Sequence, residues 1–121
     1  MNKNDLQERM TAFAVRIISM VDALPPTLGA QTLARQVVRS GTSPSANYRA
    51  ACIAKSDKDF LNKLKMVEEE LDETCHWIDI IMIKSSRIEP LYQEYKELLS
   101  IIVKSIVTTR TRLNADKLQN I

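Results

Sequence analysis

Only one short segment of this chain carries residue types that could bind a metal ion or act as a nucleophile with its base. It reads Glu73-Thr74-Cys75-His76, and a Glu and a His three residues apart on a helix can present two metal ligands on one face. A di-iron site in a helical bundle needs two such motifs and further glutamates, but His76 is the only histidine in the chain. Cys75 and His76 cannot act together, because adjacent helical residues point in different directions. The segment therefore predicts neither a metal site nor a catalytic pair.

The other candidates for chemistry also lack partners. Cys52 has no local base, and no Gly-rich phosphate loop or nucleophile motif occurs. The Ser-rich run from Ser40 to Ser45 is not a Gly-rich phosphate cradle. Asn47 and Tyr48 are polar groups that we interpret as hydrogen-bonding residues of an interface. We therefore expect a protein that is not an enzyme and that uses no metal, cofactor or small-molecule substrate.

The cysteines and the apolar runs bear on the compartment. Cys52 and Cys75 have neither CxxC spacing nor a disulfide framework, so we expect two free, buried thiols in a reducing compartment. Residues 1–20 are too charged for the apolar segment of a signal peptide. Apolar runs such as Ile80–Ile83 are far shorter than the roughly 20 residues that span a bilayer. These features predict a cytoplasmic protein with no membrane partner.

Basic side chains leave a nucleic-acid contact open. The net charge of +2 is too small by itself to imply a polyanionic partner. Arg35, Lys55 and Lys58 fall in the basic part of the chain, but no aromatic residues are interleaved with them as on single-strand binding surfaces. A single copy is expected to bind RNA or DNA weakly, whereas several copies could bind by avidity.

The length and the punctuation of the chain favour one all-α domain. A chain of 121 residues with only two Gly and four Pro fits a single domain over residues 1–121 and argues against a turn-rich β protein. Apolar residues recur every three or four positions along four segments. We expect helices at about residues 4–24, 28–55, 57–84 and 89–114, followed by a frayed tail at 115–121. Short connections between helices of similar length favour an antiparallel up-down-up-down four-helix bundle.

Caps and prolines place the helix ends. Asn4 or Asp5 can cap the first helix, and Pro25-Pro26 ends it because proline lacks an amide donor. Ser56 can cap the third helix, with Asp59 three residues later in the first turn.

The second helix has an unusual centre. Pro44 removes the amide that would bond to the Ser40 carbonyl, which predicts a kink or a break near residue 44. The residues around Pro44 are small, and small side chains let another helix approach closely. That helix can belong to the same bundle or to another subunit, and the sequence leaves both open. The fourth helix also carries more apolar surface than one stripe needs, which suggests a second packing partner.

Charge is segregated along the chain. The acidic block consists of Glu68, Glu69, Glu70, Asp72, Glu73 and Asp79. It can form a solvated surface, or its members near the seam can need basic partners such as Arg39, Arg49 and Lys63.

The order of these motifs resembles the bacterial four helix bundle family, also called the 23S rRNA intervening-sequence protein family. The resemblance covers about residues 10–114. Its second-helix run is Ser40, Ser43, Pro44 and Asn47. Its third helix opens with Ser56, Asp59 and Phe60 and continues with Lys63-Leu64, Glu70 to Glu73 and Trp77-Ile78.

The resemblance implies a four-helix bundle that assembles as a homopentameric ring. The family name comes from genes inside 23S rRNA intervening sequences and does not define a biochemical role. We therefore interpret the chain as a non-enzymatic homo-oligomeric scaffold or adaptor, with a nucleic-acid-binding accessory factor as the alternative. The residues expected at the subunit interface or in the family motif are Ser40, Ser43, Asn47, Tyr48, Asp59, Phe60, Lys63, Glu70, Glu73 and Trp77.

Overall fold

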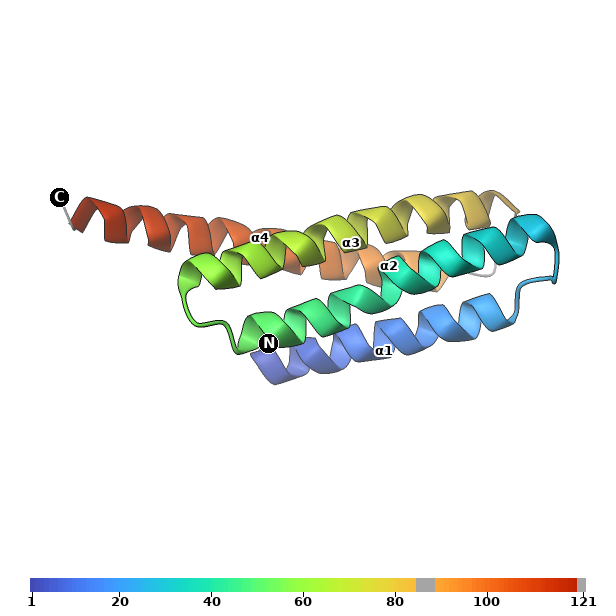
Figure 1. The fold of residues 1–121 in the computed structure, drawn as a ribbon, viewed down its shortest axis with the longest axis horizontal. Coiled ribbons are helices and arrows are strands. Elements are labelled where there is room, and N and C mark those ends of the chain that lie inside the picture. Colours follow the sequence, from blue (N-terminus) through green and yellow to red (C-terminus); the bar gives the residue numbers. More distant parts are fainter. Residues whose placement is uncertain (85–88, 120–121) are drawn as a thin grey trace.

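Four helices make up the fold in a computed structural model that describes residues 1–84 and 89–119. They are α1 (Lys3–Asp22), α2 (Leu28–Cys52), α3 (Asp57–Lys84) and α4 (Glu89–Gln119). Successive helices run in opposite directions and pack side by side, and α1 also contacts α4 (Figure 1). The described residues contain no strand. The expected all-α class with four helices is confirmed.

The core is one apolar stripe from each helix. Its side chains are mostly aliphatic, because only six residues of the chain, or 5%, are Phe, Trp or Tyr. Fully buried members include Phe13 and Ile17 of α1, Val37 of α2, Leu71 of α3 and Leu98 of α4. Spacings of three and four residues put these positions on one face of each helix, as the sequence pattern predicts.

The helix ends differ in detail from the sequence expectations. Asn2, rather than Asn4 or Asp5, caps α1: its Oδ1 accepts from the Asp5 amide at 2.9 Å, and the Asp5 carboxylate accepts from the Asn2 amide at 3.2 Å. Ser56 caps α3 as predicted, with its Oγ accepting from the Asp59 amide at 3.0 Å. Helix α2 ends at Cys52 instead of residue 55. The Ile53 amide donates to the Ala50 carbonyl, three residues back, and the chain then leaves the helical path before Ser56 caps α3.

Helix α2 passes through Pro44 without interruption. The two residues before Pro44 donate their hydroxyl groups to carbonyl groups one turn earlier in the helix. Thr42 donates to the Val38 carbonyl at 2.6 Å and Ser43 donates to the Arg39 carbonyl at 2.7 Å. The expected break is therefore wrong, whereas the kink near residue 44 stays a prediction.

The small residues of α2 have two different environments. Gly41 is buried against α1, and a Cβ placed there would lie 2.8 Å from Cγ1 of Ile17. Ser43 is only half-buried and Ala46 is exposed. Close packing inside the bundle therefore explains Gly41, whereas Ser43 and Ala46 lie on the outside of α2.

Helix α4 is longer than the sequence pattern indicates. It continues to Gln119, five residues past the predicted end near residue 114, and its last turns project beyond the end of the bundle (Figure 1). The residues from Arg110 to Gln119 are exposed except for the half-buried Leu113. Apart from the ion pair between Arg112 and Asp57, the other described helices leave this segment exposed. Its apolar period is therefore lost, while Ala, Leu, Lys and Gln still favour a helix. Residues 120 and 121 of the predicted frayed tail lie outside the described residues.

No helix among the described residues is long and apolar enough to cross a membrane.

Candidate protein interface on helices α2 and α3

The α2 residues that carry the family resemblance divide between the core and the surface. Ser40 and Tyr48 are buried, whereas Ser43 and Asn47 are half-buried on the outer side of the helix. The hydroxyl groups of Ser40 and Thr74 are hydrogen-bonded at 2.9 Å, and this pair joins α2 to α3 inside the bundle. Ser40 therefore positions the helices and does not face a partner.

Tyr48 has a raised pKa of about 12, first because burial disfavours the charged phenolate and then because Cys52 lies beside it. A phenol with this pKa stays protonated at neutral pH. The buried Tyr48 therefore packs in the core and offers no acid or base for chemistry.

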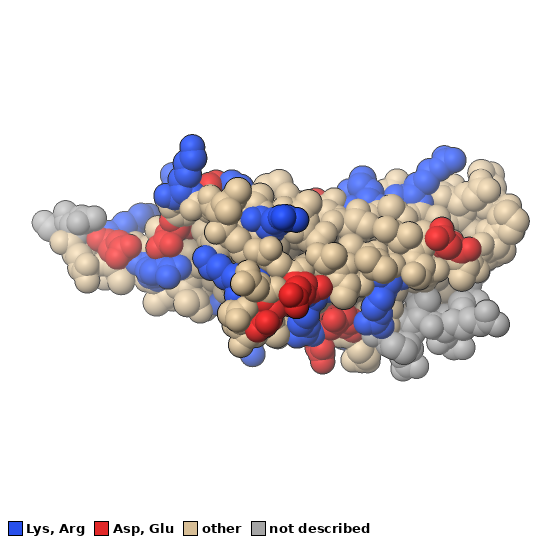
Figure 2. All heavy atoms as spheres, turned by 90° about the horizontal axis from the view of Figure 1, so that it is seen from below, with Lys and Arg blue, Asp and Glu red and all other residues tan. Residues whose placement is uncertain are grey.

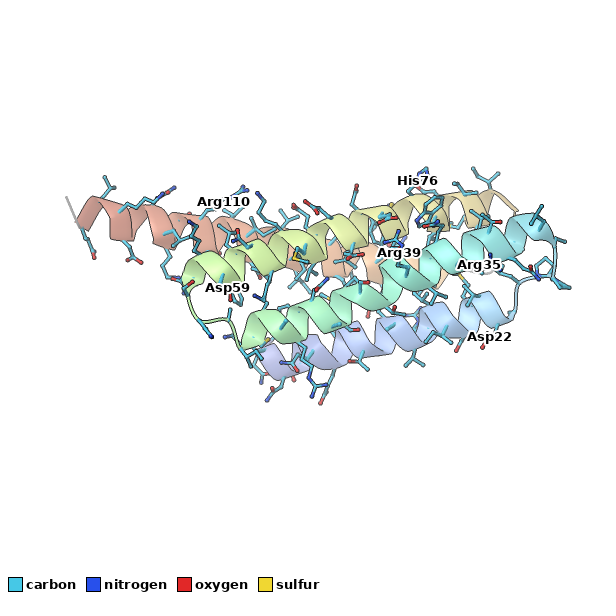
Figure 3. The ribbon with its side chains drawn as sticks, viewed as in Figure 1. Asp22, Arg35, Arg39, Asp59, His76 and Arg110 are labelled. Atoms are coloured by element: carbon cyan, nitrogen blue, oxygen red, sulfur yellow. The ribbon has the colours of Figure 1, made fainter. Side chains whose placement is uncertain are left out.

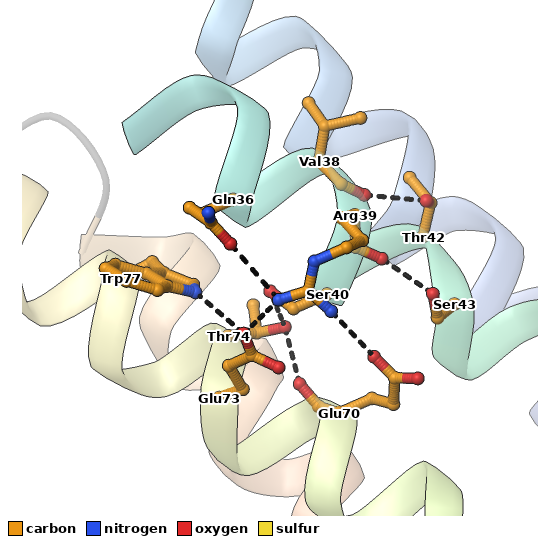
Figure 4. Close-up of polar contacts among 10 residues, drawn as sticks. All are labelled: Gln36, Val38, Arg39, Ser40, Thr42, Ser43, Glu70, Glu73, Thr74 and Trp77. Carbon is orange, nitrogen blue, oxygen red and sulfur yellow. Dashed lines mark hydrogen bonds and ion pairs between the residues drawn. The ribbon is translucent and has the colours of Figure 1, made fainter. Parts of the chain in front are cut away.

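A cluster of charged side chains connects the outer sides of α2 and α3 (Figure 4). The guanidinium group of Arg39 pairs with the Glu73 carboxylate and also donates to Oε1 of Gln36 at 3.2 Å. Its other nitrogen lies 3.8 Å from Oε2 of Glu70. Nε1 of Trp77 donates to Glu73 at 3.3 Å. One arginine thus serves two carboxylates, which leaves the cluster with an excess of negative charge.

Glu70 is the least satisfied member of this cluster. Its Oε2 atom is buried and has no hydrogen-bond donor among the described residues, since the Arg39 nitrogen is too distant for a hydrogen bond. Burial raises the pKa of Glu70, Glu73 and Glu69 raise it further, and Arg39 opposes the shift. A further hydrogen-bond donor at this position would be stabilising.

Asp59, Phe60 and Lys63 lie at the start of α3. Lys63 pairs with Asp59 at 2.6 Å, and this hydrogen bond lowers the pKa of the Asp59 carboxyl. The ammonium group of Lys3 lies 5.4 Å from the centre of the Phe60 ring. These contacts fix the first turn of α3 against the N-terminus of the chain.

The partners proposed for the acidic block are therefore partly right. Arg39 does pair with Glu70 and Glu73. Lys63 instead pairs within its own helix, and Arg49 lies beside α1, where it lines a groove with Glu8.

The half-buried motif residues share one side of the molecule. Counting along α3 at 100° per residue places Asp59, Met66, Glu70, Glu73 and Trp77 within about 60° of one another, in one stripe beside the core-facing side of the helix. We call this stripe, together with Ser43, Ala46 and Asn47 of α2, the outer α2–α3 face. Its Met66 and Trp77 side chains are of types that are enriched at protein interfaces, so this face suits contact with another protein surface.

His76 of the Glu-x-x-His motif lies on the surface of α3. It is exposed, and its ring lies 4.8 Å from the Trp77 ring. Among residues 1–84 and 89–119, no three His, Cys, Asp or Glu side chains gather as metal ligands. Glu73 of the Glu-x-x-His motif is instead occupied by Arg39 and Trp77. The Sγ atom of Cys75 lies 3.7 Å from Oδ2 of Asp79.

The three basic residues considered for nucleic-acid contact do not form one surface. Arg35 lies in the first half of α2, seventeen residues before the helix ends at Cys52, which corresponds to about 25 Å. Figure 3 shows Arg35 and Asp59 toward opposite ends of the bundle. Lys55 instead lines a groove with Lys3 and Arg112. On the side of the molecule drawn in Figure 2, basic and acidic side chains are interspersed.

Three ion pairs between residues far apart in the sequence had no signal in the sequence. Arg9 of α1 pairs with Glu94 at 2.6 Å and with Glu97 at 2.9 Å, and these contacts raise its pKa. Arg112 of α4 pairs with Asp57 at 2.8 Å. Each joins residues more than fifty positions apart, so only the folded arrangement identifies them.

Comparisons with known proteins agree with this fold. A sequence model described as 23S rRNA-intervening sequence protein matches residues 2–105. A crystal structure from Bacteroides thetaiotaomicron VPI-5482, titled as a protein with unknown function from the S23 ribosomal protein family, is similar to this chain. The two are 29% identical with a TM-score of 0.80, and the match covers 88% of this chain and 98% of that one. No curated protein matches this chain.

Proposed function

The chain belongs to the 23S rRNA-intervening sequence protein family, and we propose that it is a non-enzymatic scaffold or adaptor that works as a homo-oligomer. The observation that carries this proposal is the position of the motif residues. Ser43, Asn47, Glu70 and Trp77 are half-buried on the outer α2–α3 face instead of lining a reaction centre. A surface with an acidic cluster, an aromatic side chain and small neighbours can bury against a second protein.

Exposed apolar side chains elsewhere support assembly. Val15 and Ile18 are 56% and 45% exposed on α1, and Val103 and Val107 are 38% and 57% exposed on α4. Each pair lies three or four residues apart and so forms a short apolar stripe on its helix. Isolated exposed apolar residues are ordinary, but stripes on two helices favour burial in an assembly.

The proposed assembly is a homopentameric ring, and the number five comes from the family resemblance. Neither cysteine forms a disulfide bond, which fits the reducing environment of the cytoplasm, where we place the protein. Size-exclusion chromatography with light scattering tests the proposal. We expect a molar mass about five times that of the 13.8-kDa chain at micromolar concentration. A single 13.8-kDa species at every concentration would refute the scaffold.

A second candidate function is that of an RNA- or DNA-binding accessory factor. The observation that favours it is the gathering of Lys3, Lys55 and Arg112 around one groove near the start of α3. Asp57 lies in the same groove and pairs with Arg112, which weakens the site for a phosphate. Binding through such groups would be nonspecific and would fall steeply with salt, because it releases counterions.

A salt titration with labelled RNA and duplex DNA separates the two functions. Lys55→Glu with Lys58→Glu should abolish binding if the nucleic-acid reading is correct, since both side chains are exposed near the groove. Arg16→Glu with Arg35→Glu, which changes the net charge equally at exposed sites that do not line this groove, is the control. An assembled protein that binds neither nucleic acid at low salt would leave only the scaffold.

A further inference from the structure

The last ten residues of helix α4, Arg110–Gln119, form an extension that the rest of the described bundle does not cover. The family match ends at residue 105, so this segment also lies beyond the part shared with the family. A helix of ten residues is marginal on its own in water. A surface that packs against it would therefore stabilise it.

One face that starts at Val107 and continues along this extension combines apolar and basic side chains. Val107, Arg110, Asn114, Lys117 and Leu118 lie within about 100° of one another around the helix axis. Val107 and Leu118 are 57% and 71% exposed, and both basic side chains are exposed. The face thus presents two apolar anchors, three turns apart, with positive charge beside them.

The outer stripe of α3 has the complementary pattern. Met66 and Trp77 are also eleven residues apart, so both pairs of anchors are separated by about 16 Å along their helices. Glu69, Glu70 and Glu73 lie between them, and residues 66–79 carry six acidic residues and no Lys or Arg. Met66 is 47% exposed. The small residues Ser43 and Ala46 of α2 lie on the same outer α2–α3 face.

The two patterns cannot meet within one chain. Arg112 pairs with Asp57 at the first residue of α3, and the helices run in opposite directions. The extension therefore continues away from α3, while the acidic stripe begins nine residues further along α3. Figure 3 shows Arg110 near the start of α3 and His76 toward its far end. Only a second copy can bring the basic extension to the acidic stripe.

We infer that the C-terminal extension of one copy docks along the outer α2–α3 face of the next copy, with Arg110 and Lys117 against Glu69, Glu70 and Glu73. This contact rests on the proposed homo-oligomeric function and names the surfaces that build the assembly. It supplies donors to a cluster in which one arginine serves two carboxylates. Because the two surfaces differ, the contact is head-to-tail and closes when the rotation between copies fits a ring.

Other occupants of the extension fit less well. Two extensions placed side by side would bring like charges together, since each carries three basic residues and one acidic residue. A nucleic-acid backbone would satisfy Arg110 and Lys117 but would leave Val107 and Leu118 in water. The acidic stripe with Met66 and Trp77 accommodates both kinds of side chain.

Charge reversal tests this contact. In Arg110→Glu with Lys117→Glu, we expect the concentration of half-dissociation, measured by light scattering, to rise by about tenfold or more, because like charges then face each other. The control is Arg16→Glu with Lys58→Glu, which changes the net charge equally at exposed sites outside both surfaces. Circular dichroism checks that both variants keep the helical fold.

Cross-linking gives a second, independent measurement. A carbodiimide joins a lysine amine to a neighbouring carboxylate, and a mixture of ¹⁴N- and ¹⁵N-labelled protein marks links between copies. We expect links between copies from Lys117 to Glu69, Glu70 or Glu73.

A wild-type monomer would refute both the scaffold and this contact. An oligomer whose mass is unchanged in the reversed variant and whose Lys117 links lie elsewhere would refute this contact alone. If the reversed variant Arg110→Glu with Lys117→Glu kept its mass but no longer bound RNA, the extension would contact nucleic acid. That outcome would refute the proposed subunit contact.

Discussion

Two glycines in the same helix should respond in opposite ways to alanine. Gly29 and Gly41 both lie in α2, but a Cβ at Gly29 would meet no atom within 4 Å. A Cβ at Gly41 would lie 2.8 Å from Cγ1 of Ile17 and 3.1 Å from its Cδ1 and Cγ2 atoms. Ile17 is fully buried, so its side chain cannot move into solvent to make room.

The magnitudes follow from two opposing terms. Replacing a helical glycine by alanine stabilises the fold by up to about 1 kcal/mol, because alanine loses less backbone entropy on folding. Overfilling a packed core costs about 1–3 kcal/mol. Gly29→Ala should therefore raise the free energy of unfolding. Gly41→Ala should be less stable than Gly29→Ala by about 1–3 kcal/mol.

Urea unfolding followed by circular dichroism measures this difference, at one protein concentration because assembly would couple to stability. Ile17→Ala should also cost less in the Gly41→Ala background than its usual value of about 2–5 kcal/mol, since the added methyl group fills part of the cavity. Equal stability of the two alanine variants, with additive effects of Ile17→Ala, would refute the close approach of α1 and α2 at Gly41.

Three further predictions concern the contacts between α2 and α3. Because the pKa of Glu70 is raised in the folded state, its contribution to stability falls as pH rises from the unfolded pKa through the folded one. Glu70→Gln should remove that fall, and an identical pH dependence of urea unfolding in both proteins would contradict it. Thr74→Val should cost about 1–3 kcal/mol by leaving the Ser40 hydroxyl unsatisfied, and adding Ser40→Ala should recover part of this loss. Ala46→Trp should lower the molar mass by light scattering while keeping the helical spectrum, because Ala46 is exposed on the outer α2–α3 face. The same change at Thr32, an exposed site in the first turns of α2, should leave the mass unchanged.

The sequence identified the helices because each one repeats a local pattern. Pro25-Pro26 and the Ser56 cap act within a few residues of their position, so they can be read without knowing the fold. The length of α4 was underestimated for the same reason. Beyond residue 114 the apolar period disappears, but loss of the period reports the loss of a packing partner and not the end of the helix.

The candidate interface was only partly predictable. Arg39 could be proposed as a partner of the acidic block from charge balance alone. Glu70 and Glu73 share this arginine, and one Glu70 oxygen has no donor among the described residues. Both features depend on the rotation of α2 against α3. The buried positions of Ser40 and Tyr48 depend on the same rotation. Helical periodicity fixes which residues share a face, but it does not fix how two faces meet.

The position of the proposed interface can be measured through Trp77, the only tryptophan in the chain. It is half-buried on the outer α2–α3 face, so covering this face should shield its indole from a soluble quencher. On dilution, we predict that quenching of Trp77 fluorescence increases over the same concentration range in which light scattering reports dissociation. Dissociation with unchanged quenching of Trp77 would place the subunit contact elsewhere and would contradict the proposed interface.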